Sequence, residues 1–208
     1  TVEQPDGTPT PVSDFLGIDL GIINIATDSD GTKHSGKPVE NVRRKHSLQR
    51  KRLQRRNTKG AKKKLKRISG SEARFRAHEN HVISKKIVQA AKRTGRGIAV
   101  EELTGIRERV TARGGEARNR LGGWAFAQLR SFIAYKCRLA GVPLVAVDPS
   151  NTSRTCSVCA HCEKANRKSQ SEFSCKACGF KANADENAAK NIKVLALAAS
   201  KPAIALAG

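Results

Sequence analysis

Four cysteines in the C-terminal third of the chain have the spacing of metal ligands. They form two C-x-x-C pairs, Cys156/Cys159 and Cys175/Cys178, with fifteen residues between the pairs. Zinc favours four thiolates in a tetrahedron at about 2.3 Å, and two tight turns that each present two sulfurs supply that geometry. The spacing predicts a structural zinc ion. Because protein sulfurs fill all four positions, this ion is not expected to be catalytic.

The first pair of ligands has an alternative in the sequence. Cys162 also forms C-x-x-C with Cys159, and His161 lies next to it. The loop length favours Cys156 and Cys159, so Cys162 is expected to be a free thiol. Cys137 falls in an apolar helical pattern, which predicts a core position. Paired spacing without a secretory signal favours metal over disulfides.

Three acidic residues lie at the ends of predicted core elements. Asp19 lies in the strand-like segment GIDLG, Glu101 follows the apolar segment GIAV, and Asp185 opens a helix seven residues after Cys178. Strand residues alternate between faces, so only one of Glu101 and Glu102 can share a face with Asp19. Each acid has a simpler interpretation: Asp19 could cap a turn or pair with arginine, the strand-end Glu could be solvated, and Asp185 could be a helix N-cap. As a set, they have the chemistry of a site for two Mg²⁺ ions and phosphodiester hydrolysis.

The net charge predicts a polyanionic partner. The chain has 40 Lys and Arg against 18 Asp and Glu, a formal charge of +22, with one Trp and one Tyr. Phosphate contacts should therefore outweigh base stacking, and affinity should fall steeply with salt. A solvated helix surface is the alternative for the basic segment 38–95. Its candidate nucleic-acid contacts are Arg43, Arg44, Arg52, Arg55, Arg56, Lys62, Lys63 and Lys64.

The order of predicted elements gives an α/β fold with a mixed sheet. Apolar periodicity predicts strands within 15–34, two long helices over 38–95, a strand over 97–103, a mobile loop over 105–120, a helix over 121–140, a strand over 142–148 and a helix over 185–198. The basic segment has only a thin apolar stripe, formed by Leu48, Leu53, Leu65 and Ile68. The helix over 121–140 has an expected apolar face formed by Trp124, Leu129, Phe132, Ile133 and Leu139. The predicted division is a flexible lead-in (1–13), a main domain (14–150 and 182–200) with a basic helical hairpin (38–95), a zinc ribbon (151–181) and a tail (201–208).

Neither a membrane span nor a signal peptide is expected. No apolar run approaches the roughly 20 residues that cross a bilayer, and the first residues lack basic and apolar signal regions. The sequence contains no Met, which predicts a fragment, a processed product or a partial reading frame.

Several segments together closely resemble the TnpB (OrfB) proteins of bacterial and archaeal insertion sequences, which are related to type V CRISPR effectors. The resemblance covers about residues 15–192, and TSRTCSVC and ADENAAKNI are its most specific parts. It implies a RuvC-like nuclease domain of RNase H fold, with a zinc ribbon inserted before the third acidic motif. Members of the family are RNA-guided, metal-dependent DNA endonucleases.

The resemblance also implies roles for individual residues. Asp19, Glu101 and Asp185 match the three RuvC carboxylates, which bind Mg²⁺ or Mn²⁺, and it therefore favours Glu101 over Glu102. The four cysteines match the ribbon's zinc ligands. DNA and a guide RNA are the implied partners, in the cytoplasm of a bacterium or archaeon. Full-length members carry an N-terminal recognition half without a counterpart here, so the expected function is that of the nuclease half.

Two other functions remain open from the residues alone. Zinc and strong basicity suffice for a non-catalytic nucleic-acid-binding module, and the chain could also be a truncated remnant of a nuclease. The discriminating observation is the placement of the three carboxylates: convergence on one region favours the nuclease, and wide separation favours binding alone.

Overall fold

The computed structural model describes residues 11–102 and 126–200. The predicted loop at 105–120, the tail at 201–208 and most of the predicted lead-in lie outside these residues. The elements are β1 (Phe15–Asp19), β2 (Asn24–Asp28), β3 (Lys33–Ser35), α1 (Lys37–Arg56), α2 (Lys59–Arg93), β4 (Gly97–Glu101), α5 (Phe126–Ala140), β5 (Leu144–Val147), the short 3₁₀ helix η1 (Lys164–Asn166), β6 (Glu172–Ser174), β7 (Lys181–Asn183) and α6 (Ala184–Ser200).

The main sheet is mixed, as the sequence predicts. Its five strands have the order β3-β2-β1-β4-β5. The meander β1–β3 is antiparallel, and its tight turn has Gly31 at φ +90°, a conformation that favours glycine. Strands β4 and β5 join parallel to β1, so the ends of β1 and β4 that carry Asp19 and Glu101 lie at the same edge.

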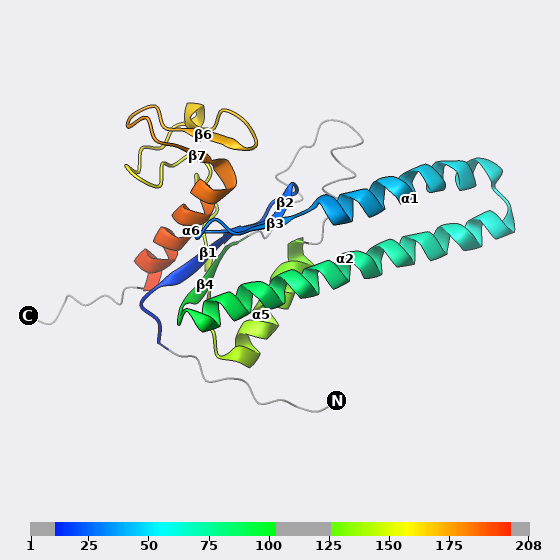
Figure 1. Ribbon diagram of the computed structural model, residues 1–208, viewed down its shortest axis with the longest axis horizontal. Helices are drawn as coiled ribbons and strands as arrows, with labels where there is room; N and C mark the ends of the chain where they lie inside the picture. Colours follow the sequence, from blue (N-terminus) through cyan, green and yellow to red (C-terminus); the bar gives the residue numbers. More distant parts are fainter. Residues whose placement is uncertain (1–10, 103–125, 201–208) are drawn as a thin grey trace, which may run out of the picture.

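Helices cover both faces of the sheet (Figure 1). Helices α2 and α5 bury one face, where the core includes Leu16, Ile18, Ile87, Ile98, Val100 and Ile133. Helix α6 buries the other face, with Phe15, Ala99, Val147, Ile192 and Ala196. Gly17 permits this close packing, because a Cβ there would lie 2.1 Å from the backbone oxygen of Ala189 in α6.

The apolar pattern of the 121–140 segment is only partly right. Helix α5 buries Leu129, Ile133 and, as predicted, Cys137. Leu139, which the pattern places on the same apolar face, is 42% exposed. The reason is helical phase: the buried residues recur every four positions, and Leu139 falls off that stripe.

Helices α1 and α2 form a long antiparallel hairpin that projects beyond the sheet (Figure 1). Asn57 connects them in a left-handed conformation, and the Thr58 hydroxyl caps α2 by accepting a 3.2 Å hydrogen bond from the amide of Ala61. Arg50 of α1 pairs with Glu72 of α2 at 2.6 Å. Few apolar residues hold the distal part together; the predicted stripe residue Leu48 is 63% exposed.

A small module precedes α6. Strands β6 and β7 form a two-stranded antiparallel sheet, and Phe173 packs with buried cysteines and Ala184 at its centre. The buried side chain of Asn166 bonds the backbone of Arg154, His161 and Lys176, which joins the two cysteine loops. The module sits at the start of α6 (Figure 1).

Candidate nuclease and metal sites

Strand alternation places two of the predicted acids on the α6 face of the sheet. In β1, Gly17 packs under α6, so Asp19, two residues on, faces the same side. In β4, Ala99 contacts the α6 core, so Glu101 also faces that side. The next residue, Glu102, pairs with Arg130 of α5 on the opposite face. The structure thus separates the two neighbouring glutamates as alternation requires.

Asp185 lies in the first turn of α6, and it is not the N-cap. The cap is Asn183, whose Oδ1 accepts hydrogen bonds from the amides of Asp185 and Glu186 at 3.2 and 3.3 Å. The Asp185 side chain is 9% exposed, and its Oδ2 accepts a 3.0 Å hydrogen bond from Nδ2 of Asn24 in β2. The N-cap alternative is therefore wrong, and the carboxylate turns toward the sheet.

Glu101 is held by the segment that follows β5. The Thr152 hydroxyl donates a 2.5 Å hydrogen bond to Glu101 Oε1. Asn191 of α6 donates to the backbone oxygens of Thr152 and Thr155, both at 2.7 Å. Helix α6 thus holds the Thr152 segment in place, and this segment in turn holds Glu101. The alternative in which this glutamate is simply solvated therefore does not apply.

Asp19 is close enough to the other two carboxylates for their negative charges to affect it. The pKa of Asp19 is raised to about 8, first by burial and then by the negative charges of Glu101 and Asp185. The pKa of Glu101 is also raised, mainly by burial. Arg167 opposes both shifts through its positive charge. This arginine of the small module therefore lies in the electrostatic neighbourhood of both acids.

The donor chemistry of this carboxylate cluster, which we define as Asp19, Glu101 and Asp185, fits a hard divalent cation. Carboxylate oxygens are the preferred ligands of Mg²⁺ and Mn²⁺, and a cation would offset the repulsion that raises the pKa of Asp19. The cluster is looser than a closed single-ion cage. Among residues 11–102 and 126–200, only the four-cysteine group brings three or more candidate ligand atoms close enough to hold one ion.

The four predicted cysteines meet at one point. The candidate ligand atoms of Cys156, Cys159, Cys175 and Cys178 all lie within 4.8 Å of one another. Two of the sulfur pairs are 3.7 and 3.5 Å apart, close to the edge of about 3.8 Å for a tetrahedron with metal–sulfur bonds of about 2.3 Å. Cys162 is not part of this group, so the cluster contains the Cys156/Cys159 pair and not the Cys159/Cys162 pair.

Backbone hydrogen bonds favour the thiolate form of one of these four cysteines. The amide of Cys178, followed by that of Ala177, helps to lower the pKa of Cys175 to about 6, so this thiol ionises readily. The pKa of Cys178 moves the other way, to about 12: a backbone hydrogen bond from Phe180 lowers it, but hydrogen bonds to neighbouring sulfurs outweigh that effect. Crowded sulfurs without a cation therefore retain a proton that metal binding would displace.

Buried asparagines couple the cysteine module to the carboxylate cluster. Asn187 of α6 accepts a 3.0 Å hydrogen bond from the amide of Ser157 and donates to the Thr155 oxygen at 2.8 Å. Ser157 lies between Cys156 and Cys159 of the four-cysteine group, and Asp185 lies two residues before Asn187. Helix α6 therefore carries Asp185 of the carboxylate cluster and also forms hydrogen bonds to the first cysteine loop.

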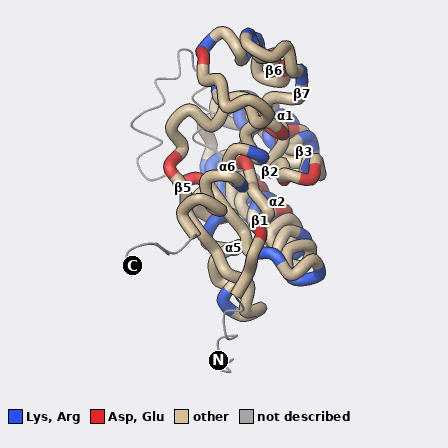
Figure 2. Tube along the Cα trace, turned by 90° about the vertical axis from the view of Figure 1, so that its left-hand side faces the viewer, with Lys and Arg blue, Asp and Glu red and all other residues tan. Residues whose placement is uncertain are grey.

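The basic hairpin presents most of the predicted contacts to solvent. Figure 2 shows Lys and Arg along α1 and α2. Arg43 is the exception, because its guanidinium makes two 2.7 Å hydrogen bonds to Glu40. The other seven predicted residues are exposed: Arg44, Arg52, Arg55, Arg56, Lys62, Lys63 and Lys64.

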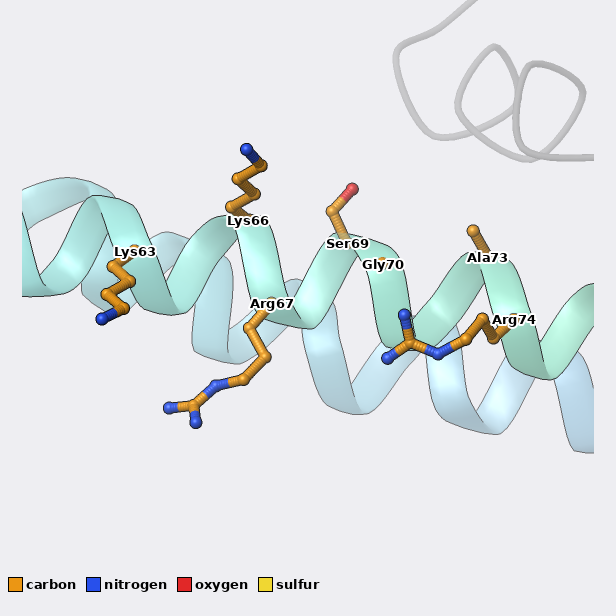
Figure 3. Close-up of a pocket in the computed structure, with 7 residues that line it drawn as sticks. All are labelled: Lys63, Lys66, Arg67, Ser69, Gly70, Ala73 and Arg74. Atoms are coloured by element: carbon orange, nitrogen blue, oxygen red, sulfur yellow. The ribbon is translucent and has the colours of Figure 1, made fainter.

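An open depression of about 1010 Å³ lies along α2 (Figure 3), on the hairpin rather than at the carboxylate cluster. Small residues, including Gly70, line part of the depression, and its other lining side chains are basic. Its lining comprises Lys63, Lys66, Arg67, Ser69, Gly70, Ala73 and Arg74. A surface with this charge and shape favours contact with a phosphate backbone.

Sequence reasoning missed the polar residues that hold the acids. Asn24 holds Asp185, Thr152 holds Glu101, and the positive charge of Arg167 opposes the raised pKa values of Asp19 and Glu101. Only the asparagines of ADENAAKNI gave a signal, because polar residues recurring on an otherwise apolar helix predict buried partners. Within the described part of the chain, no helix is both long and apolar enough to span a membrane.

Fold and site together define a mixed α/β domain joined to a small module in which four cysteines cluster. A family model for OrfB of IS605 elements, described as "Probable transposase", matches residues 1–106. A second, described as "Cas12f1-like, TNB domain", matches residues 126–192. The chain belongs to the OrfB (TnpB) family.

Named relatives agree with this membership. The chain is 33% identical to the CRISPR-associated endodeoxyribonuclease Cas12f1 of Sulfoacidibacillus thermotolerans, over 92% of this chain and 48% of the relative. It is also 33% identical to the putative RNA-guided DNA endonuclease InsQ of Escherichia coli K12, over 91% of this chain and 51% of the relative. The chain thus spans about half the length of these relatives.

The fold agrees with a solved structure of a related protein. A cryo-EM structure of a Cas12f1–sgRNA–target DNA complex superposes with a TM-score of 0.71 and 25% identity, over 88% of this chain and 50% of that one. A second Cas12f ternary complex superposes with a TM-score of 0.68 and 28% identity, over 93% of this chain and 40% of that one.

Proposed function

We propose that this chain is the nuclease half of an RNA-guided, metal-dependent DNA endonuclease, with a RuvC-like domain of RNase H type and a zinc ribbon. The observation that carries the proposal is the convergence of Asp19, Glu101 and Asp185 from three separate elements on the α6 face of one sheet edge. Charge coupling between them supports a shared site. The relatives named as RNA-guided or CRISPR-associated DNA endonucleases support the reaction and the partners.

The carboxylate cluster would hold the catalytic ions. Mg²⁺ or Mn²⁺, when bound, supplies Lewis acidity for the scissile phosphate and a water of lowered pKa. Asn24 keeps the Asp185 carboxylate turned inward, and Thr152 fixes one oxygen of Glu101. Arg167 lies close enough to both Asp19 and Glu101 to meet the negative charge of a phosphate bound between them.

The four cysteines would hold a structural zinc ion. Their sulfur spacing supports tetrahedral coordination with no open position. Asn187 and Asn191 then transmit the order of the ribbon to α6 and to the Thr152 segment. Bound zinc would in this way help to hold Asp185 and Glu101 in place relative to each other, because the positions of both residues depend on these hydrogen bonds.

The basic hairpin would follow a nucleic-acid backbone. Exposed Lys and Arg on α1 and α2, the depression on α2 and the formal charge of +22 support phosphate contacts by this element. In the parent protein, the phosphates would belong to the guide RNA or to the target DNA.

The test is cleavage by the full-length parent, loaded with its RNA, using Glu101→Gln and the matched control Glu102→Gln. We expect Glu101→Gln to abolish Mg²⁺-dependent DNA cleavage while keeping RNA and DNA binding. Glu102→Gln should cleave normally, because Glu102 faces Arg130 on the other side of the sheet. Cleavage that survives Glu101→Gln would contradict the assigned site. A parent that binds DNA but never cuts it would support the non-catalytic binding module instead.

A further inference from the structure

Thr27 in β2 has a buried hydroxyl without a partner. Its side chain is 1% exposed, and its Oγ1 makes no hydrogen bond. In the described part of the chain, one other buried side-chain polar atom shares this state, Nδ1 of His46. That nitrogen lies 3.5 Å from a carboxylate oxygen of Glu72, so it has an electrostatic partner. Thr27 has none, and an unpaired buried hydroxyl is unfavourable.

The register of the sheet sets Thr27 beside Asp19. The two residues are directly opposite in the antiparallel β1–β2 pair. Directly opposed side chains share a face, with their Cβ atoms about 4.5–5.5 Å apart. The Thr27 side chain therefore lies on the α6 face beside the side chain of Asp19, which makes no hydrogen bond with the described residues. On its other side Thr27 faces Lys33 of β3, which is exposed.

We infer that Thr27 is a positioning residue for Asp19, which donates a hydrogen bond to the Asp19 carboxylate when that group binds a divalent ion. This inference rests on the proposed metal site. In the absence of a bound cation, the Thr27 hydroxyl makes no hydrogen bond. A carboxylate that binds a cation through one lone pair keeps other lone pairs free, and the Thr27 hydroxyl can donate to one of these and so orient the group.

A purely structural role predicts the opposite behaviour. If Thr27 is present only because β-branched residues suit a strand, Val should serve as well for ion binding. The isosteric change Thr27→Val removes the unpaired hydroxyl and keeps the shape. It should therefore leave the metal-free chain as stable as the wild type or more so.

The experiment compares Mn²⁺ binding and thermal stability in four zinc-loaded chains: wild type, Thr27→Val, Thr27→Ser and Asp19→Asn. Bound Mn²⁺ is measured from the loss of the free-ion EPR signal, and stability from the melting temperature without Mn²⁺. We expect Thr27→Val to weaken Mn²⁺ binding about tenfold, as loss of a charge-assisted hydrogen bond predicts, without lowering the melting temperature. Thr27→Ser, which keeps the hydroxyl, should bind Mn²⁺ within about threefold of the wild type.

The outcomes separate this inference from the site on which it rests. If Asp19→Asn loses Mn²⁺ binding and Thr27→Val keeps it, Thr27 has no positioning role, and the metal site stands. If Asp19→Asn binds Mn²⁺ like the wild type, the metal site itself is wrong. If Thr27→Val lowers metal-free stability and Mn²⁺ affinity together, and Thr27→Ser does not restore the affinity, the role is structural. In the double variant Asp19→Asn/Thr27→Val, the second change should have no further effect on binding.

Discussion

Replacing Asp19 by Asn should stabilise the metal-free chain in a way that grows with pH. The Asp19 carboxyl has a pKa of about 8 in the folded chain, raised from its ordinary value of 3.8 first by burial and then by the neighbouring carboxylates. The native state therefore keeps a proton that the unfolded chain has released, so stability falls as pH rises between these two values. Asn has a similar shape and no charge, so Asp19→Asn removes this dependence.

The magnitude follows from linkage. The free energy of unfolding should fall by about 1.4 kcal/mol per pH unit while the native carboxyl holds its proton and the unfolded one does not. Between pH of about 5.5 and 7.5, the wild type should therefore lose about 2.5 kcal/mol relative to Asp19→Asn. For a chain of 208 residues, this corresponds to a difference in melting temperature of about 5–10 °C.

The assay is thermal or urea unfolding of both chains, zinc-loaded and free of Mg²⁺, at several pH values in that window. Only the difference between the two chains is interpreted, because His34, whose pKa is lowered by burial, titrates in both. Adding Mg²⁺ should flatten the wild-type curve, since a bound cation favours the ionised carboxyl. Parallel stability curves for wild type and Asp19→Asn would refute the reasoning, because they would show that Asp19 is ionised in the folded, metal-free chain.

Three further predictions concern the other parts of the structure. Cys159→Ser should lose the single bound zinc ion and disorder the cysteine module, whereas Cys162→Ser should keep both the zinc and the fold of the module. Metal analysis measures the zinc content, and circular dichroism measures the order of the module. Equal zinc content in the two variants would contradict the proposed ligand set. Asn187→Ala should destabilise the zinc-loaded chain by about 2–3 kcal/mol in urea unfolding, because two buried hydrogen bonds are lost; a change below about 0.5 kcal/mol would argue against the coupling. Removing three exposed arginines of α1 should weaken single-stranded DNA binding and reduce the log–log salt slope by about 2; an unchanged slope would mean that α1 does not contact phosphates. The residues to replace by Ala are Arg52, Arg55 and Arg56.

Periodicity and turn chemistry predict most of the fold. The apolar, β-branched residues around GIDLG and in GIAV predict β1 and β4, and the basic run followed by the helical spacing of Ile83 and Ile87 predicts two long helices. These patterns are local, so neighbouring residues suffice. Helical phase was less well determined: Leu139 fits an apolar stripe in the sequence, but packing of α5 on the sheet chose the stripe through Cys137.

The cysteine ligands were predictable as residues because the C-x-x-C spacing is itself local geometry. The sequence alone could not exclude Cys162, because both pairings form tight turns. In the folded module, the Asn166 side chain and the packing around Phe173 bring Cys175 and Cys178 close to Cys156 and Cys159, and Cys162 is not part of that group.

The sequence by itself determined which chemical groups are present: four thiolates at metal spacing, three acids at element ends, and an excess of positive charge. Tertiary structure decided how they meet. Parallel pairing of β1 and β4 and the packing of α6 over Gly17 bring together Asp19, Glu101 and Asp185, which are far apart in the chain. Asn24, Thr27, Thr152 and Arg167 acquire their roles only there, because their partners lie on other elements. The cysteine module, which looked like a separate zinc scaffold in sequence, is joined through Asn187 and Asn191 to the helix that carries Asp185.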